Sequence, residues 1–327
     1  MENKKEQVII VGAGPCGLSA AIECKKRGLD PLIIEKGNIV QAISNYPTHQ
    51  QFFSTSQKLE IGGYPFVTEE RKPKRSQALA YYREVVRRTT PRIHAFEEVK
   101  TIHATETGTF EVVTETRQGQ KNVYTADHVV MATGYYDHPN YMGIPGEALP
   151  HVFHYFKEAH PYFDCDVTVI GGKNSAVDAA LELNKAGARV TVLYRGSEYS
   201  ESIKPWILPE FNSLVKSGEV NMIFNASIKE ITEETVKFEV AGQTYDQKCD
   251  FVFAMTGYHP DHSLLKEMGI NIDAETGRPF FNPETMETNV PHLFIAGVIA
   301  AGNNANEIFI ENGRFHGERI AETIIKR

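Results

Sequence analysis

A glycine-rich turn near the N-terminus has the residue types and spacing that bind a dinucleotide. Gly12, Gly14 and Gly17 form a G-x-G-x-x-G pattern directly after the β-forming run Val8–Val11. Glycines at this spacing allow a tight turn and close backbone approach to a pyrophosphate at the N-terminus of the next helix. Glu35 closes the following strand, where its carboxylate can accept hydrogen bonds from ribose hydroxyls. The pattern therefore predicts a dinucleotide site rather than a turn that only packs a helix against a strand.

A second, less regular glycine turn follows the expected strand Val167–Ile170. Lys173 takes the middle glycine position, where its side chain crowds a pyrophosphate although its ammonium offsets phosphate charge. The next strand leads into Arg195 and has no acid there, which favours the 2′-phosphate of NADP over NAD. The alternative is a degenerate fold in which Arg195 is a solvated surface charge. The predicted NADPH-binding residues are Gly171, Lys173, Asn174, Ser175, Ala176 and Arg195.

Cys16 stands inside the first glycine turn, at the start of the expected helix. Unpaired backbone N–H groups and the helix dipole lower a thiol pKa there, whereas a cofactor pyrophosphate raises it, so the sequence leaves the net direction open. Cys16 is either a nucleophile that attacks a disulfide substrate or a small apolar residue that fills space. The other three cysteines, Cys24, Cys165 and Cys249, form no CxxC pair and are interpreted as structural free thiols.

The elements that must position these residues follow from hydrophobic patterning, and they form two β-α-β units. Residues 41–66 show no clean periodicity and are rich in aromatic side chains, which indicates an irregular segment near a site. The expected helices are Leu18–Arg27, Ser76–Arg88, Ala176–Lys185 and Glu311–Ile325. The main expected strands are Val8–Val11, Pro31–Glu35, Phe110–Glu115, His128–Met131, Val167–Ile170, Arg189–Tyr194, Phe251–Met255 and Leu293–Ala296.

Composition narrows the class of protein. The 327 residues suffice for two domains, with 41% apolar and 23% charged residues. A net charge of −8 argues against a general nucleic-acid binder and fits a cytoplasmic enzyme. No apolar run approaches the about 18 residues of a membrane span, and the first is too short for a signal peptide. We therefore predict a cytosolic protein with no nucleic-acid or membrane partner.

The histidines suggest no metal site. The four that cluster in sequence are His138, His151, His154 and His160, and their spacing fits no metal-binding pattern. Surface and packing roles are the simpler interpretation for all four. His154 or Tyr155 stays open as a proton donor.

Three further motifs resemble the flavoproteins that bind two dinucleotides. They are Ala132-Thr133-Gly134, Thr256-Gly257 and the late FIAG turn Phe294–Gly297. Their order and the chain length resemble low-molecular-weight thioredoxin reductases. The resemblance implies an α/β fold with two Rossmann-like, three-layer ββα domains, a discontinuous FAD domain (1–138 and 258–327) and an inserted NADPH domain (139–257). It also implies homo-oligomers, dimers or tetramers, and a rotation between the domains. The implied FAD-binding residues are Gly12, Gly14, Pro15, Cys16, Gly17, Glu35, Lys36, Ala132, Thr133, Gly134, Gly297 and Val298.

The chain departs from thioredoxin reductases at three points. No CxxC pair precedes the second glycine turn, Val298 stands where an Asp usually holds the ribityl chain, and GxGPAG has become GAGPCG. The motifs GAGPCG, GGKNSA and IAGVIAAGNNA resemble the bacillithiol disulfide reductases of low-GC Gram-positive bacteria. That resemblance implies NADPH-dependent reduction of bacillithiol disulfide through FAD. Since a disulfide reductase without CxxC needs another thiol or a bare flavin, the nucleophile interpretation of Cys16 is preferred.

Other interpretations remain open from sequence. A ferredoxin or flavodoxin–NADP reductase has the same architecture and also lacks CxxC, and the basic stretch 71–88 would be its docking face. That stretch is otherwise a solvated helix face or a site for the carboxylates of bacillithiol. Against the alternative, the chain ends at Arg327 just after the last expected helix, whereas relatives with that activity commonly carry an extension over the flavin. A redox sensor that switches a partner is a third possibility.

The segment Asn45–Tyr64 is expected to border the flavin. Its aromatic residues Phe52, Phe53 and Tyr64 either line the approach of the substrate or only pack against neighbouring side chains.

Overall fold

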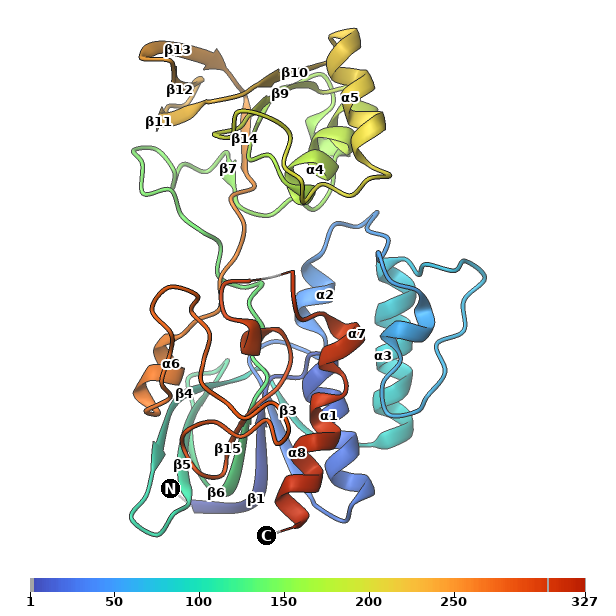
Figure 1. Cartoon of the computed structure of the whole chain (residues 1–327), viewed down its shortest axis with the longest axis vertical. Helices are drawn as coiled ribbons and strands as arrows, with labels where there is room; N and C mark the ends of the chain where they lie inside the picture. Colours follow the sequence, from blue (N-terminus) through green and yellow to red (C-terminus); the bar gives the residue numbers. More distant parts are fainter. Residues whose placement is uncertain (1–2, 305, 327) are drawn as a thin grey trace. The chain divides into compact units, whose positions relative to one another are not determined.

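The computed structural model describes residues 3–304 and 306–326, and it divides into two compact units. The first unit combines the chain up to His138 with the chain from His259 onward, and the second spans Pro139–Tyr258. The sequence-based boundary lay one residue earlier, before Tyr258. The first unit is thus built from both ends of the chain, with the second inserted between them (Figure 1).

The first unit is built on a seven-stranded mixed sheet with the order β3-β2-β1-β6-β5-β4, in which β15 also pairs with β6. The strands are β1 (Asn3–Val11), β2 (Pro31–Glu35), β3 (Arg92–Ala95), β4 (Glu97–Ala104), β5 (Phe110–Thr116), β6 (Lys121–Met131) and β15 (Leu293–Ile295). Strands β3, β2, β1, β6 and β15 run parallel, whereas β4, β5 and β6 form an antiparallel meander. The apolar run of β2 is buried throughout, because helices and the meander cover the parallel strands.

Two helices from opposite ends of the chain pack side by side in this unit: α1 (Pro15–Lys26) and α8 (His316–Ile325) (Figure 1). Gly317 allows their close approach, because a Cβ there would lie 2.5 Å from the Cα of Ala20. The remaining helical segments are α2 (Gln41–Asn45), η1 (Ser56–Leu59), α3 (Arg75–Thr89), α6 (Ser263–Glu267), η3 (Val298–Ala301) and α7 (Ile310–Gly313).

Two sequence-based expectations for this unit were wrong in detail. The single helix predicted over 311–325 is divided into α7 and α8. Arg314 and Phe315 keep helical dihedral angles, but the N–H of Phe315 donates to Asn312, only three residues earlier, and the Arg314 side chain donates hydrogen bonds to the carbonyls of Gln57 and Glu60. The segment 41–66 is not wholly irregular, since it contains α2 and η1.

The second unit has a five-stranded parallel sheet with the order β10-β9-β8-β14-β7 and a separate antiparallel sheet β11-β12-β13. The strands are β7 (Val152–Phe153), β8 (Asp166–Ile170), β9 (Arg189–Leu193), β10 (Val220–Ile223), β11 (Ser227–Ile231), β12 (Thr235–Val240), β13 (Gln243–Lys248) and β14 (Phe251–Ala254). Its helices include α4 (Asn174–Lys185) and α5 (Leu208–Ser217). The helix α5 had not been expected from the sequence.

The two units repeat one arrangement around their glycine turns. The N–H of Gly12 donates to the carbonyl of Ile34, and the N–H of Gly171 donates in the same way to Leu193. Parallel strands followed by a helix, with an antiparallel layer beside them, occur in both units. The predicted α/β class with two three-layer ββα domains is therefore confirmed.

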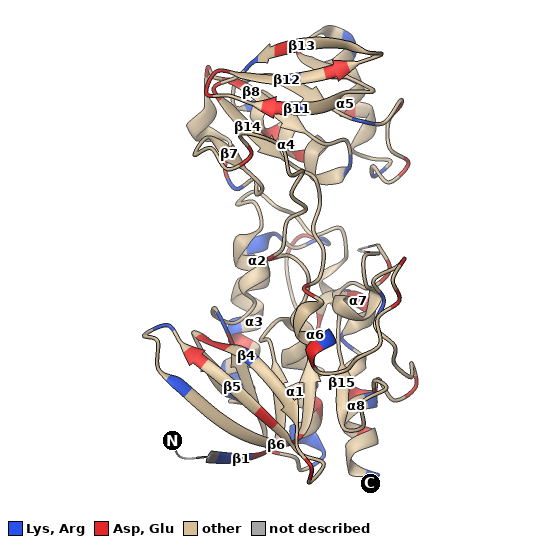
Figure 2. Ribbon diagram, turned by 90° about the vertical axis from the view of Figure 1, so that its left-hand side faces the viewer, with Lys and Arg blue, Asp and Glu red and all other residues tan. Residues whose placement is uncertain are grey.

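Charge is spread over each unit rather than concentrated (Figure 2). In the basic stretch 71–88, Arg75 donates to the carbonyls of Ile43 and Ser44, Lys74 pairs with Glu70, and Arg88 pairs with Glu84. Several of its cations are thus tied to neighbouring groups. Among the residues with described positions, no helix is long and apolar enough to cross a membrane.

Candidate cofactor sites

The first glycine turn is shaped by close backbone contacts at two of its three glycines. Gly12 has φ +107°, and a Cβ there would lie 2.5 Å from the carbonyl oxygen of Ala132. A Cβ at Gly17 would lie 2.0 Å from the carbonyl oxygen of Gly12. A Cβ at Gly14, in contrast, would meet nothing within 4 Å. Gly12 and Gly17 therefore close the turn, whereas Gly14 leaves open space at the N-terminus of α1.

That open space is bordered by hydrogen-bond donors of the helix. The first intrahelical bond of α1 joins the N–H of Leu18 to the carbonyl of Gly14 at 2.9 Å. The N–H groups of Cys16 and Gly17 precede it and have no intrahelical acceptor. Pro15, at the first helical position, has no N–H to satisfy. Donors beside open space, at the positive end of a helix dipole, fit a pyrophosphate group.

Glu35 lies at the end of β2 and is 7% exposed. One carboxylate oxygen accepts a hydrogen bond from the N–H of Ala13 and the other from the N–H of Gly37, each at 2.7 Å. Burial raises the pKa of Glu35, while the two N–H donors oppose that shift. Lys36, the next residue, pairs with Asp137 at 2.9 Å. The carboxylate is thus held beside the glycine turn, where the remaining lone pairs fit ribose hydroxyls.

The other residues predicted for this site come from neighbouring strand ends. The N–H of Ala132 donates to Val11, and the N–H of Ala296 donates to Met131. Thr133 lies against the Gly12 turn, and Gly134 and Gly297 both have positive φ, at 73° and 80°. Val298 begins the short helix η3. These segments meet at the carboxyl ends of β1, β6 and β15, which is where open α/β sheets bind their ligands.

The Cys16 thiol lies between two glycines from the C-terminal part of the chain. A Cβ at Gly297 would lie 3.1 Å from Sγ of Cys16, and one at Gly313 would lie 2.9 Å from it. Burial raises the pKa of Cys16 to about 12. The sequence left open whether the pKa of Cys16 is raised or lowered. In the structure this pKa is raised, so the thiol is protonated at neutral pH.

His316, which no sequence motif indicated, fixes the turn beside this thiol. Its Nδ1 accepts a hydrogen bond from the N–H of Gly297 at 3.1 Å, and the residue is 7% exposed. An accepting Nδ1 requires the neutral ring with its proton on Nε2. Burial lowers the pKa of His316 to about 4. A neutral histidine therefore holds the Gly297–Val298 backbone, where the usual Asp is missing.

Acidification is expected to destabilise the first unit through His316. The folded chain protonates this ring only near pH 4, whereas the unfolded chain does so near 6.5, so falling pH favours unfolding across that interval. The loss amounts to about 3 kcal/mol between about pH 6.5 and about pH 4. Urea unfolding of the wild type and of His316→Gln at both pH values measures this loss. The carboxylates, which also titrate in this range, contribute equally to both proteins, so the difference between the two belongs to His316. An equal acid sensitivity of the two proteins would contradict the assignment.

The second glycine turn keeps the backbone geometry and changes the side chains. Gly171 has φ +138°, and a Cβ there would lie 2.5 Å from the carbonyl oxygen of Met255 and 3.2 Å from Cβ of Ala176. Lys173, Ser175 and Arg195 are exposed. Their charges and hydroxyl lie at the surface beside this turn and fit a phosphate-bearing ligand.

The side chain of Asn174 makes structural hydrogen bonds that the sequence did not predict. Its amide donates to the carbonyl of Ser202 at 2.7 Å and accepts from the N–H of Lys204 at 2.9 Å. The side chain thus secures the segment 202–204 against the start of α4. We expect its contribution to a nucleotide site to be indirect.

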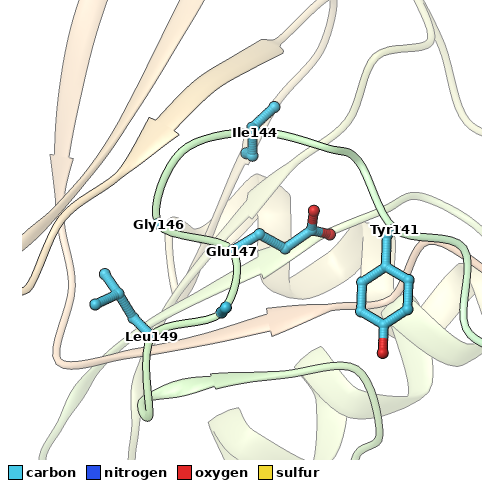
Figure 3. Close-up of a pocket in the computed structure, with 6 residues that line it drawn as sticks. Tyr141, Ile144, Gly146, Glu147 and Leu149 are labelled. Carbon is cyan, nitrogen blue, oxygen red and sulfur yellow. The ribbon is translucent and has the colours of Figure 1, made fainter.

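The second unit has a cavity of about 430 Å³ along the segment 141–149 (Figure 3), and no residue of the second glycine turn lines it. Tyr141, Ile144 and Leu149 line it, with Glu147 on the same loop. The carboxylate of Glu147 accepts hydrogen bonds from the N–H groups of Met142 and Gly143, so it stabilises the loop. The cavity is mainly apolar and brings together none of the predicted site residues.

The possible proton donors His154 and Tyr155 both lie in the second unit. His154 Nε2 is 3.7 Å from Glu147, its ring packs edge-on against Tyr141, and burial lowers its pKa. Tyr155 stacks on Tyr258 with the ring centroids 5.2 Å apart. Both residues have packing partners, and their role as proton donors stays a prediction.

The remaining cysteines have no disulfide partner. Cys24 and Cys249 are buried, and Cys165 is partly exposed with its thiol directed to the carbonyl of Phe163. None of the three lies at a glycine turn. Cys16 is therefore the cysteine whose position suits redox chemistry.

Comparison with known proteins assigns the family. The model of the pyridine nucleotide-disulphide oxidoreductase family matches residues 9–297. The chain belongs to this family. It is 65% identical to bacilliredoxin reductase Bdr of Bacillus subtilis (strain 168) over 324 residues, which cover 99% of this chain and 98% of the relative.

Two solved structures are similar over the whole chain. Bacillithiol disulfide reductase Bdr (YpdA) from Bacillus cereus has 66% identity and a TM-score of 0.97, covering 99% of this chain and 100% of that chain. The reductase of the same name from Staphylococcus aureus has 57% identity and a TM-score of 0.94, with 99% of both chains covered. The resemblance predicted from the motifs is confirmed. The chain is a flavin-dependent disulfide oxidoreductase, and the predicted cofactors, FAD and NADPH, are those of its family.

Proposed function

We propose that the protein reduces bacillithiol disulfide with NADPH. In the overall reaction NADPH, a proton and the disulfide give NADP⁺ and two thiols. The observation that carries the proposal is the position of Cys16, whose thiol lies inside the dinucleotide-binding turn between Gly297 and Gly313. The near full-length similarity to the bacillithiol disulfide reductases supports the same substrate.

The first glycine turn is the site that suits FAD. Gly14 leaves the space for the pyrophosphate, Glu35 offers ribose acceptors, and the turns Ala132–Gly134 and Gly297–Val298 border the same strand ends. FAD, when bound, accepts a hydride from NADPH and passes the electron pair on. The second turn, with Gly171, Lys173 and Arg195, suits NADPH.

Cys16 would exchange with the substrate disulfide. Its sulfur attacks one sulfur of the disulfide, a mixed disulfide forms, and the first thiol leaves with a proton. The electron pair from NADPH, with the proton of its hydride and one proton from solvent, would then cleave the mixed disulfide, release the second thiol and restore the Cys16 thiol. Because burial raises the pKa of Cys16, the resting thiol is protonated, and its small thiolate fraction is the form that would attack the disulfide.

Turnover with a set of acceptors tests the proposal. NADPH oxidation by the purified FAD-loaded protein would be compared with bacillithiol disulfide, glutathione disulfide, a bacilliredoxin–bacillithiol mixed disulfide and ferredoxin. We expect turnover with bacillithiol disulfide and little with glutathione disulfide. Turnover with the bacilliredoxin mixed disulfide alone would mean that the acceptor is bacilliredoxin, as the name of the B. subtilis relative states for that protein. Ferredoxin reduction without disulfide reduction would make it a ferredoxin–NADP reductase, and no turnover at all would favour a redox sensor.

We also propose a cytoplasmic location and a homo-oligomeric state. Four free cysteines suit a reducing compartment. Light scattering of the purified protein distinguishes a dimer or tetramer from a monomer.

A further inference from the structure

Tyr194 takes, in the second unit, the position that Glu35 has in the first. In the parallel pair β1–β2, Val11 lies opposite Ile34, and in β8–β9 Ile170 lies opposite Leu193. The glycine turns begin at the residue after Val11 and after Ile170. Glu35 and Tyr194 are the residues that follow Ile34 and Leu193 along the chain. The two side chains therefore leave equivalent points of equivalent strands.

The Tyr194 ring fills the volume that the carboxylate uses in the first unit. The Glu35 carboxylate bridges the N–H groups of Ala13 and Gly37. The corresponding residues of the second unit are Gly172 and Gly196. A Cβ at Gly172 would lie 2.3–2.5 Å from Tyr194 ring atoms, and a Cβ at Gly196 would lie 2.4 Å from the ring. The ring thus lies directly against both glycines, and larger residues at either position would displace it.

The Tyr194 ring also packs against other aromatic side chains. Phe224 packs edge-on against Tyr194 with the centroids 6.5 Å apart, and Tyr199 packs edge-on against Phe224 at 5.2 Å. This aromatic row keeps the ring over the glycines. The position that carries a carboxylate in the first unit therefore carries an uncharged aromatic ring in the second.

This exchange has a direct consequence for nucleotide choice. A carboxylate at this position would accept hydrogen bonds from the ribose hydroxyls of NADH and would repel the 2′-phosphate of NADPH. The ring does neither. Arg195 and Lys173 are exposed beside it, and neither makes an ion pair with the residues whose positions are described. Both cations are therefore available to a phosphate dianion.

We infer that Tyr194 is a specificity-determining residue that, together with Arg195, selects NADPH over NADH by replacing the ribose-binding carboxylate with an aromatic ring. The inference rests on the proposed NADPH site in the second unit. It goes beyond Arg195 and the missing acid noted from the sequence, because it assigns part of the selection to an uncharged ring that occupies the carboxylate's volume against Gly172 and Gly196. It also explains why glycine stands at both 172 and 196.

The test measures binding of adenosine 2′,5′-bisphosphate and adenosine 5′-monophosphate to the FAD-loaded full-length protein by calorimetry. The wild type should prefer the bisphosphate. In Tyr194→Glu the ratio of the two affinities should fall by about 100-fold, through a tenfold or larger change in each Kd. Tyr194→Phe is the matched control, and its ratio should remain that of the wild type.

If the new carboxylate of Tyr194→Glu impairs folding, Tyr194→Gln replaces it in the test, because this variant removes the ring without adding a charge. It should gain affinity for the monophosphate. A wild-type ratio in well-folded Tyr194→Glu and Tyr194→Gln would overturn the inference while leaving the NADPH site intact. A changed ratio in Tyr194→Phe would overturn it as well, because the hydroxyl rather than the ring would then decide. A wild type that binds neither nucleotide would overturn the proposed NADPH site itself.

Discussion

Cys16→Ala should lower NADPH oxidation with bacillithiol disulfide by about a thousandfold or more, the scale expected when a nucleophile is lost. The FAD absorbance spectrum should persist, because alanine fits the space between Gly297 and Gly313 in which the thiol lies. Reduction of ferricyanide, which needs no thiol, should continue at the wild-type rate. Steady-state assays with both acceptors make the comparison.

Cys24→Ala is the matched control for this variant. Cys24 lies on the same helix α1 and is fully buried in the core, away from the glycine turn. Its loss should reduce stability slightly and leave disulfide turnover unchanged. If Cys16→Ala retained full disulfide turnover, the thiol would be a packing residue and the electrons would pass to the substrate without it.

The pH dependence of the wild type follows from the raised pKa of Cys16. Below a pKa of about 12, the thiolate fraction rises about tenfold for each pH unit. If thiolate attack limits the reaction, the rate with the disulfide should rise from neutral to alkaline pH, whereas the ferricyanide rate should not follow it. Stopped-flow measurements on the reduced protein at several pH values give both profiles. Identical profiles for the two acceptors would argue against a thiolate in the limiting step.

Gly14→Ala and Gly17→Ala should separate cofactor binding from folding. A Cβ at Gly14, where φ is −68°, meets no protein atom within 4 Å, so this variant should keep its stability to within about 1 kcal/mol. The methyl group would project into the space assigned to the pyrophosphate, and FAD affinity should fall by about 100-fold. A Cβ at Gly17 would meet the backbone oxygen of Gly12 at 2.0 Å, which should cost about 3 kcal/mol or more of stability.

The two variants are compared by urea unfolding of the FAD-free proteins and by fluorescence titration with FAD. Unchanged FAD affinity in Gly14→Ala would show that the pyrophosphate lies elsewhere. A stable Gly17→Ala protein would contradict the packing that closes the turn.

The parallel sheets were predictable because burial on both faces leaves a continuous apolar run. The strand predicted over Pro31–Glu35 has those bounds in the structure, and all five residues are buried. The antiparallel layer of the second unit gave a weaker signal, because β13 (Gln243–Lys248) is polar and largely exposed. At the break between α7 and α8, Arg314 contacts residues about 250 positions earlier, and no local pattern contains such contacts.

The local backbone of the candidate site was predictable where a motif describes it, as at the Gly12 turn and the strand that ends at Glu35, while the binding roles of these residues stay predictions. The site was not predictable where distant segments meet. The direction of the Cys16 pKa depends on burial between Gly297 and Gly313, and the task of His316 depends on a turn from a different strand. The equivalence of Tyr194 and Glu35 could have been predicted from the sequence, because Tyr194 follows Gly171 at the same spacing as Glu35 follows Gly12.

An anaerobic single-turnover experiment shows whether the electrons of NADPH reach the disulfide. The FAD-loaded protein would be reduced with one equivalent of NADPH and mixed with bacillithiol disulfide, while flavin absorbance and free thiols are followed. We expect the flavin to be reoxidised and two thiols to appear for each NADPH consumed. A flavin that stays reduced with the disulfide, yet is reoxidised at once by ferredoxin, would contradict the proposed disulfide reduction.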